Sequence, residues 1–335
     1  MLNSIGLNFQ ICKIGWKYLI YGIGAKTIDF RGEQMKVRDI LKEGVAKLEA
    51  SGIDNAEYDA RELLKQAYGM DTAEFLMNLD RTLCLGASGG SEPSDITECP
   101  GDCGAKLTFE TSINMRSRRV PLQHILGHVG FMGYDFKVNS HVLIPRQDTE
   151  LLCETVLANE KISSYKVLDM CTGSGCIAIS LKLIGGYEDV AAADIDKDAL
   201  NVALRNASIN KADIRLITSD LFENVSESFD IIVSNPPYIE TAEIAKLEPE
   251  VREHDPLKAL DGGTDGLDFY KRIIEACALK GSKEVLKSGG RLYFEIGFDQ
   301  AKAVSELMEE AGFTDIRTVK DLAGLDRVVY GKRSF

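Results

Sequence analysis

From residue 165 onward the chain alternates short apolar runs with longer amphipathic stretches, and this alternation restricts the fold more than any other feature. The apolar runs predict strands over Lys166–Asp169, Val190–Asp194, Ile214–Thr218, Phe229–Ser234 and Arg291–Ile296. Helices are predicted between them, over 175–184, 196–209, 241–247, 267–287 and 299–311. Such an alternation predicts a doubly wound α/β sheet. Two more strands, Ile316–Val319 and Arg327–Tyr330, predict a closing hairpin that places one antiparallel strand in the sheet.

The amino-terminal part of the chain has a different pattern. Apolar residues recur with a helical period in Val37–Leu48, and further helices are predicted over 54–68, 72–79 and 107–118. Residues 120–145 interleave glycines with aromatic and β-branched residues, which is typical of a β-hairpin. We therefore expect a poorly ordered extension or a misplaced start codon over 1–34, a helical domain over 35–119 with a Gly/Ser/Pro-rich loop insertion at 86–105, a hairpin linker over 120–147 and the α/β domain over 148–335.

Charge and cysteine usage exclude several protein classes. The formal net charge of −13 argues against a protein that coats nucleic acid. Of the eight cysteines only Cys99 and Cys103 form a close pair, and two further ligands at zinc spacing are missing, so no metal site is predicted. Scattered cysteines favour a reducing cytoplasm, and no run of 18 apolar residues predicts a membrane span. A local basic cluster, interpreted either as a solvated face or as an RNA or phosphate contact, comprises Arg116, Arg118, Arg119, Lys137 and Arg146.

The first strand of the alternating region runs into a glycine-rich turn and then into a helix. Glycines allow a ligand to approach the backbone closely, and the helix start offers unpaired N–H groups. Asp194 ends the second strand, where its carboxylate is expected to accept both hydroxyls of a ribose. Leu221 and Phe222 follow the third strand and either pack on an adenine ring or belong to the core. The turn also fits the dinucleotide pattern G-x-G-x-x-A, which does not separate NAD from S-adenosylmethionine. Its residues are Cys171, Thr172, Gly173, Ser174 and Gly175.

The fourth strand ends at Ser234 because two consecutive prolines follow Asn235. Prolines have no N–H, so this turn presents carbonyl acceptors, with the Asn235 amide at one end and the Tyr238 ring at the other. Two acceptors and an aromatic face suit a flat NH₂ group. Ligands of doubly wound sheets bind beyond the carboxyl ends of the strands, where the strand order reverses. We therefore expect Asn235 and the glycine turn to face one crevice.

Taken together, these motifs resemble the peptide chain release factor N5-glutamine methyltransferases, the HemK/PrmC family, over about residues 35–332. Asn-Pro-Pro-Tyr alone also occurs in DNA adenine methyltransferases, but its combination with Val142–Arg146 and Gly262–Leu267 is far more specific. The chain departs from the family at Cys171, where glycine is usual, and near Gln147. Further matching stretches are Pro121–Gly127, Asp194, His254–Pro256, Glu295–Gly297 and Asp326–Val329.

The resemblance implies a seven-stranded class I methyltransferase sheet and a monomeric enzyme of translation termination. Its methyl donor would be S-adenosylmethionine, and its target the glutamine of the Gly-Gly-Gln motif in release factors 1 and 2. The helical domain would contact the release factor, with no stable nucleic acid or membrane partner. His254 is interpreted as a loop-ordering residue, with a catalytic role as the alternative. Catalysis is assigned to Asn235, Pro236 and Tyr238, substrate binding to these and Pro237, and cofactor binding to Cys171, Thr172, Gly173, Ser174, Gly175, Asp194, Leu221, Phe222 and Asn235.

Three alternatives remain open at this point. An N6-adenine or N4-cytosine methyltransferase would use the same chemistry, but it needs a basic groove to hold a flipped base. A non-catalytic module that binds S-adenosylmethionine has no need of Asn235. A NAD oxidoreductase is supported only by the glycine pattern.

Overall fold

The computed structural model describes residues 34–84, 100–279 and 284–334, together with three short strands nearer the amino terminus. The chain forms two compact units, Met1–Ile125 and Leu126–Phe335. The three strands pair as an antiparallel sheet, and the rest of the predicted extension, like Cys99 and most of the predicted insertion, lies outside the described residues. These strands are β1 (Gln10–Ile14), β2 (Lys17–Tyr21) and β3 (Thr27–Ile28).

The first unit is built mainly from helices, as its apolar period predicts. Gly44 permits close contact between two of them, because a Cβ there would lie 2.5 Å from Cζ of Phe109. Helix α4 begins at Pro100, so the prediction of a loop as far as 105 is wrong over its last six residues. The elements are β4 (Gln34–Lys36), α1 (Val37–Ala50), α2 (Ala56–Tyr68), α3 (Thr72–Asn78), β5 (Thr82–Cys84) and α4 (Pro100–Arg116), with α5 (Leu122–Leu126) at the unit boundary.

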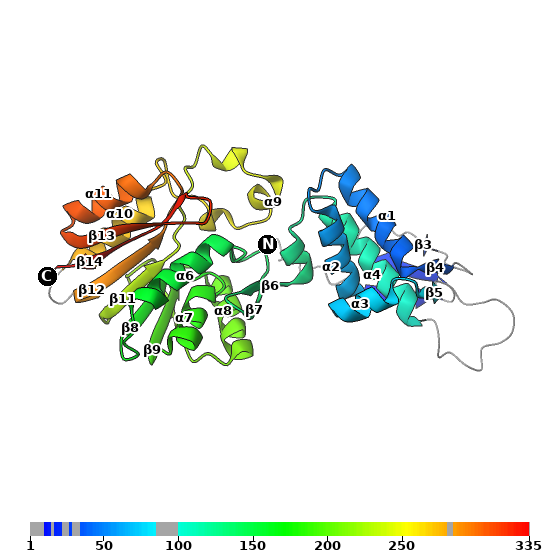
Figure 1. The fold of residues 1–335 in the computed structure, drawn as a ribbon, viewed down its shortest axis with the longest axis horizontal. Coiled ribbons are helices and arrows are strands. Elements are labelled where there is room, and N and C mark those ends of the chain that lie inside the picture. Colours follow the sequence, from blue (N-terminus) through cyan, green and yellow to red (C-terminus); the bar gives the residue numbers. More distant parts are fainter. Residues whose placement is uncertain are drawn as a thin grey trace. The chain divides into compact units, whose positions relative to one another are not determined.

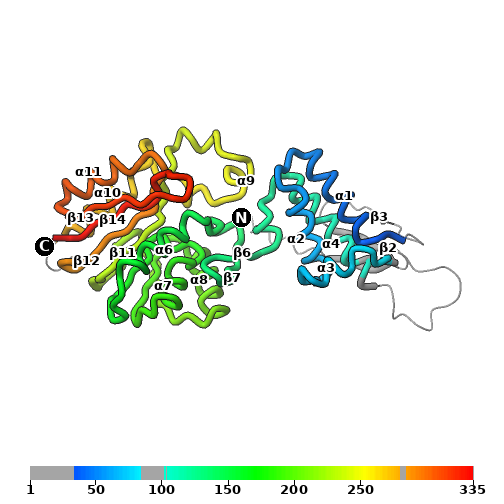
Figure 2. Tube along the Cα trace, in the orientation of Figure 1, coloured from blue at the N-terminus to red at the C-terminus, as the bar shows by residue number. Residues whose placement is uncertain are grey.

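The second unit contains the seven-stranded sheet that the strand–helix alternation predicts. Its strand order is β10-β9-β8-β11-β12-β14-β13, so the order reverses between β8 and β11. Strands β8 to β12 are parallel, and β14 is antiparallel to both of its neighbours, which confirms the predicted fold class. Figure 2 shows the last two strands in red beside the orange β12. The strands are β8 (Lys166–Met170), β9 (Asp189–Asp194), β10 (Arg215–Thr218), β11 (Phe229–Ser234), β12 (Leu286–Glu295), β13 (Phe313–Lys320) and β14 (Asp326–Arg333).

Helices cover both faces of this sheet (Figure 1). One core cluster joins the sheet to α6 (Gln147–Asn159), α7 (Cys176–Gly185) and α8 (Lys197–Asn210). The other joins it to α10 (Asp268–Ala278) and α11 (Ala301–Glu310). Burial on both faces explains why the central strands are continuous apolar runs. A hairpin of β6 (His128–Phe131) and β7 (Tyr134–Lys137) precedes α6, while the connection from β11 to α10 carries η1 (Ile244–Lys246), α9 (Pro249–Arg252) and η2 (Leu257–Ala259).

Two predicted boundaries are wrong around β12. The helix predicted over 267–287 ends at Ala278, and the strand predicted from Arg291 already begins at Leu286. Between these strand residues the register of β11 against β12 shifts. A Cβ at Gly290 would lie 2.8 Å from the carbonyl oxygen of Asp230, and Gly289 has a φ of +78°. The two glycines therefore form a bulge inside the strand, which an apolar pattern cannot indicate.

Candidate active site

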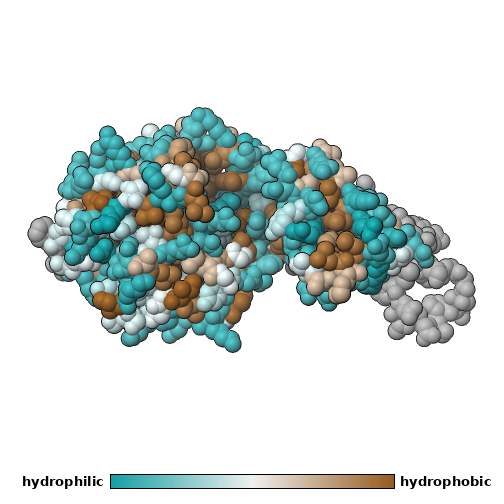
Figure 3. Space-filling model, in the orientation of Figure 1, coloured by the Kyte–Doolittle hydropathy of each residue, from teal (hydrophilic) through white to brown (hydrophobic). Residues whose placement is uncertain are grey.

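A cavity lies at the carboxyl ends of β8, β9 and β11, where the strand order reverses. It brings together the glycine turn and the Pro-Pro turn. In the view of Figure 3 apolar side chains line a hollow beside the loop that carries α9. The predicted residues on its wall are Cys171, Thr172, Gly173, Ser174, Asp194, Leu221, Asn235 and Pro237. Other predicted residues, Gly175, Phe222, Pro236 and Tyr238, are not on this wall.

The glycine turn adopts a left-handed backbone at three positions. Gly173 and Gly175 have φ values of +54° and +81°, and Cys171 has +63°, a region that side chains rarely adopt. A glycine would be unstrained at position 171, since it has no Cβ. Gly175 contacts α8 and not the cavity, because its Cβ position lies 3.0 Å from Cβ of Ala203.

The side chain of Asp169 holds this turn through hydrogen bonds. Its Oδ2 accepts hydrogen bonds from the Thr172 hydroxyl and from the Ala178 backbone N–H. The side chain is fully buried, and burial raises its pKa to about 7 against these two hydrogen bonds. Its Oδ1 has no hydrogen-bond partner among the described residues.

Asp194 is held by two backbone amides. Oδ2 accepts from Gly173 N–H at 2.9 Å, and Oδ1 accepts from Asp196 N–H at the same distance. Burial raises the pKa of this carboxyl, and Asp196 adds to the effect. Each oxygen keeps a lone pair for a further donor in the cavity. Asp196 itself caps α8 by accepting from Asp198 N–H, as its position predicts.

Two apolar residues follow β10. Leu221, with a φ of +45°, lines the cavity and is also a buried member of the core cluster on the α10 side, and the partly buried Phe222 packs against that cluster without lining the cavity. Phe269 and Arg272 of α10 also line the cavity, and Arg272 donates to Asp220 at 2.7 Å. The sequence does not indicate that Phe269 and Arg272 line the cavity, because α10 is far along the chain from β10.

The Pro-Pro turn is anchored from several sides. The Ser234 hydroxyl donates to the Met170 carbonyl at 2.6 Å, and Asn235 Nδ2 donates to Thr149 Oγ1 at 3.2 Å. Burial raises the pKa of Tyr238 well above its ordinary value. A Cβ at Gly262 would lie 2.8 Å from the Tyr238 Cα, so the loop that contains Gly262 packs directly on the turn.

Gln300 joins this turn to two other loops, and the sequence analysis missed it. Its Nε2 donates to the carbonyl oxygens of Tyr238 at 2.9 Å and of Gly266 at 3.3 Å. Its Oε1 accepts from Gly297 N–H at 2.9 Å. One side chain therefore fixes three backbone segments around the site.

A buried carboxyl lies behind Asn235. Glu295, at the end of β12, is 2% exposed. Burial raises its pKa to about 7, against hydrogen bonds from Thr149 and Asn235 that lower it. Its Oε2 has no hydrogen-bond partner in the described part of the chain.

Two ion pairs hold the segment 249–259 beside the cavity. Arg146 donates to Asp255 Oδ2 at 2.8 Å, and Lys258 pairs with Asp196. Burial raises the pKa of Asp255 to about 6 although Arg146 lowers it. The Nε2 of His254 is buried and has no hydrogen-bond partner among described residues.

Three residues of the predicted basic cluster form hydrogen bonds or ion pairs inside the unit to which they belong. Arg116 Nε donates to Asp59 at 2.6 Å in a buried pair, and Arg119 donates to the Gly52 carbonyl at 2.7 Å. Arg146 pairs with Asp255, as above. In the described part of the chain, no helix is long and apolar enough to cross a membrane.

Comparison with known proteins gives matches over nearly the whole chain. A family model described as PrmC N-terminal domain matches residues 39–87, and one described as Methyltransferase small domain matches 145–249. The Geobacter sulfurreducens Release factor glutamine methyltransferase is 38% identical over 297 residues, which cover 88% of this chain and 96% of that protein. Its Clostridium acetobutylicum counterpart is 45% identical over 227 residues, or 66% and 78% of the two chains.

A solved structure is also similar, the release factor-specific protein-(glutamine-N5) methyltransferase of Alicyclobacillus acidocaldarius. It is 31% identical with a TM-score of 0.36, and the match covers 60% of this chain and all of that one. The match to the Geobacter sulfurreducens protein is long enough to include parts of both units, the glycine turn and the Pro-Pro turn. The chain therefore belongs to the release factor glutamine methyltransferase family.

Proposed function

We propose that this protein transfers a methyl group from S-adenosylmethionine to the side-chain amide nitrogen of the glutamine in the Gly-Gly-Gln motif of release factors. One observation carries the proposal: the Asn235 amide lies in the same cavity as Asp194 and the glycine turn. An acceptor for a planar NH₂ group and a site for a nucleoside thus share one space. The family relatives, which are named for this reaction, support the choice of substrate.

The cavity residues fit the methyl donor. Asp194 has lone pairs for ribose hydroxyls, and Leu221 offers an apolar surface for a flat ring. Gly173 and Ser174 bring the backbone to the cavity wall without bulky side chains. S-adenosylmethionine, when bound, supplies an electrophilic methyl group.

The residues of the Pro-Pro turn would orient the target amide. An amide nitrogen is a poor nucleophile because its lone pair is delocalised, so orientation and electrostatics carry the catalysis. Asn235 Oδ1 and the backbone carbonyl of Pro236 accept the two hydrogens of the NH₂ group, with Pro237 shaping the cavity wall. These acceptors stabilise positive charge that develops on nitrogen, and Tyr238 packs against the amide plane. The proton leaves to water after transfer.

The helical unit is assigned to recognition of the release factor. Two apolar side chains of α3 support this, since Leu76 is 60% exposed and Met77 is 76% exposed. Figure 3 shows apolar side chains gathered on this unit among hydrophilic ones. We propose release factors 1 and 2 as substrates, a monomeric enzyme and a cytoplasmic location.

The test is a transfer assay with labelled S-adenosylmethionine. Three substrates are compared: a release factor, the same factor with Gly-Gly-Ala in place of Gly-Gly-Gln, and duplex DNA. We expect label on the first protein alone. Label on DNA but not on the release factor would overturn the proposal in favour of an adenine or cytosine methyltransferase.

A further inference from the structure

The side chains that contact the Asn235 amide include a buried acid, Glu295. Glu295 and Thr149 are each only 2% exposed. Thr149 also lines the cavity beside Asn235, whereas Glu295 does not line it. Asn235 Nδ2 donates to Thr149 Oγ1 at 3.2 Å. Ser234 pairs with Phe294 in the register of β11 against β12, so Asn235 and Glu295 follow neighbouring residues, and hydrogen bonding by Thr149 and Asn235 lowers the pKa of Glu295. These three residues come from β11, α6 and β12, so the fold itself assembles them.

The direction of these hydrogen bonds follows from the chemistry of the groups. An ionised carboxylate can only accept, so Thr149 and Asn235 must both donate to Glu295. When Thr149 gives its single hydrogen to the carboxylate, its oxygen is left to accept from Asn235. The two hydrogens of the Asn235 NH₂ group are thereby committed to Thr149 and Glu295. Its Oδ1 is left for the cavity, which decides an amide orientation that only the network can assign.

We propose that Glu295 and Thr149 are positioning residues that hold the Asn235 amide with its oxygen toward the substrate. The inference rests on the proposed function, in which this oxygen accepts a hydrogen of the target NH₂. A flipped Asn235 would oppose one NH₂ group to another, and a desolvated donor without an acceptor is costly. The acid thus acts through Asn235 and touches no reacting atom.

The protonation state of Glu295 should then control turnover. Below about pH 7 the neutral carboxyl gains an O–H, can donate, and no longer fixes the direction of its neighbours. We expect kcat to fall as the pH falls through this value. Asp148 raises the pKa of Glu295 and Arg327 lowers it. Other titratable groups that interact with this carboxyl are Cys153, Cys176, Tyr238 and Tyr270.

The first test is Glu295→Gln, which keeps size but adds a donor. We expect kcat on the release factor to fall by about 100-fold. The affinity for S-adenosylmethionine should stay unchanged, and the acid limb of the pH profile near 7 should disappear. Glu160→Gln is the matched control, because Glu160 is a buried acid that accepts from Tyr293 at 2.6 Å and does not line the cavity. It should keep both kcat and the acid limb.

The second test uses Thr149 and decides the question even if Glu295→Gln fails to fold. Thr149→Val removes the hydroxyl at constant shape and should lower kcat by about 10-fold or more, whereas Thr149→Ser should restore it. Wild-type rates in both Glu295→Gln and Thr149→Val, with an active parent enzyme, would refute the positioning role and leave the proposed function intact. A parent enzyme that does not methylate release factor would instead refute the function.

Discussion

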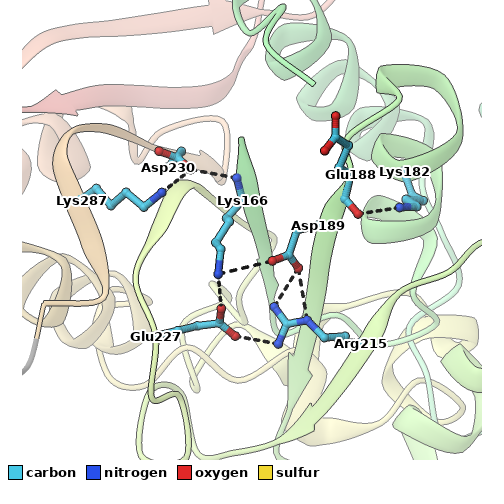
Figure 4. A network of polar contacts seen from close by, with 8 residues as sticks. All are labelled: Lys166, Lys182, Glu188, Asp189, Arg215, Glu227, Asp230 and Lys287. Atoms are coloured by element: carbon cyan, nitrogen blue, oxygen red, sulfur yellow. Dashed lines mark hydrogen bonds and ion pairs between the residues drawn. The ribbon is translucent and has the colours of Figure 1, made fainter. Parts of the chain in front are cut away.

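Charged side chains are arranged differently at the amino ends and at the carboxyl ends of the strands in the catalytic sheet, which are here called its amino edge and its carboxyl edge. At the amino ends of the strands, acids and bases are paired with one another (Figure 4). Lys166 contacts Glu227 at 2.8 Å and Asp189 at 3.5 Å, while Arg215 contacts the same two acids at 2.6 and 2.9 Å. Nearby, Asp230 accepts from Lys287 at 2.7 Å. This edge is a closed, partly exposed ion-pair network.

At the carboxyl edge several acids are buried and only partly satisfied. Asp169 and Glu295 each keep one oxygen without a hydrogen-bond partner among the described residues, as does Asp255 nearby. Burial raises the pKa of all three, whereas a hydrogen bond from Lys166 lowers the pKa of Glu227 at the other edge. A buried acceptor without a hydrogen-bond partner costs stability. In the described part of the chain such carboxyls gather at the carboxyl edge, which indicates that this edge is adapted to a function.

The largest expected effect is on chemistry at the carboxyl edge. Asn235→Ala removes an acceptor for the target amide and should lower kcat by about 100- to 1000-fold. Affinity for S-adenosylmethionine, measured by calorimetry, should change little because the other cavity residues remain. A variant with near-normal turnover would remove Asn235 from the catalytic machinery.

The next effect concerns cofactor affinity. Asp194→Ala deletes a carboxylate that is already held by two backbone N–H groups, so it removes a pre-oriented acceptor. We expect the Kd for S-adenosylmethionine to rise by about 10- to 100-fold, as befits a charged hydrogen bond. Calorimetry measures it, and an unaltered Kd would show that this carboxylate does not bind the ribose.

A third experiment measures how the free energy of unfolding depends on pH, because the raised pKa of Asp169 predicts the direction of that dependence. The folded pKa of Asp169, about 7, lies above the ordinary value, so the folded state binds the proton more tightly. The contribution of Asp169 to the free energy of unfolding should therefore decrease as pH rises toward 7 and level off above it. Relative to wild type, Asp169→Asn should gain about 1 kcal/mol or more in this free energy between pH 5 and pH 8.

Asp189→Asn at the opposite edge is the control for that experiment. Burial acts to raise the pKa of Asp189, but Arg215 and Lys166 outweigh it, and the folded pKa is lowered. Its contribution to stability is present at neutral pH and is lost as the pH falls through the acidic range. If denaturant titrations gave the two variants the same pH trend, the contrast between the edges would be refuted.

The smallest effect is expected from Arg215→Ala in the ion-pair network. Its side chain is 47% exposed, and exposed pairs contribute about 0.2–1 kcal/mol each. We expect a loss of about 1 kcal/mol in low salt that shrinks in high salt, with turnover unchanged. Lost methyl transfer would show that the amino edge also serves the reaction.

Much of this arrangement could be predicted because it is local in sequence. A strand followed by glycines, an acid ending a strand and a strand stopped by two prolines each have a signature within ten residues. The site residues that the sequence did not predict lie far along the chain from the residues that they contact, and the tertiary fold places them together. Thr149 reaches Asn235 from α6, and Gln300 reaches Tyr238 from the turn before α11. Leu221 and Phe222 are adjacent apolar residues that the sequence cannot distinguish, yet in the structure only Leu221, which has a positive φ, lines the cavity.

The position of β14 between β12 and β13 has a consequence for how the sheet is completed. Among the described strands, β13 pairs only with β14, although β13 comes first along the chain. A chain made from its amino terminus therefore releases β13 before it has any strand to join. Val328 and Val329 of β14 are fully buried, so this part of the core is complete only after β14 has been made. Strand β12, which carries Glu295, therefore keeps the backbone groups on its β14 side unpaired until the last part of the chain has been synthesised.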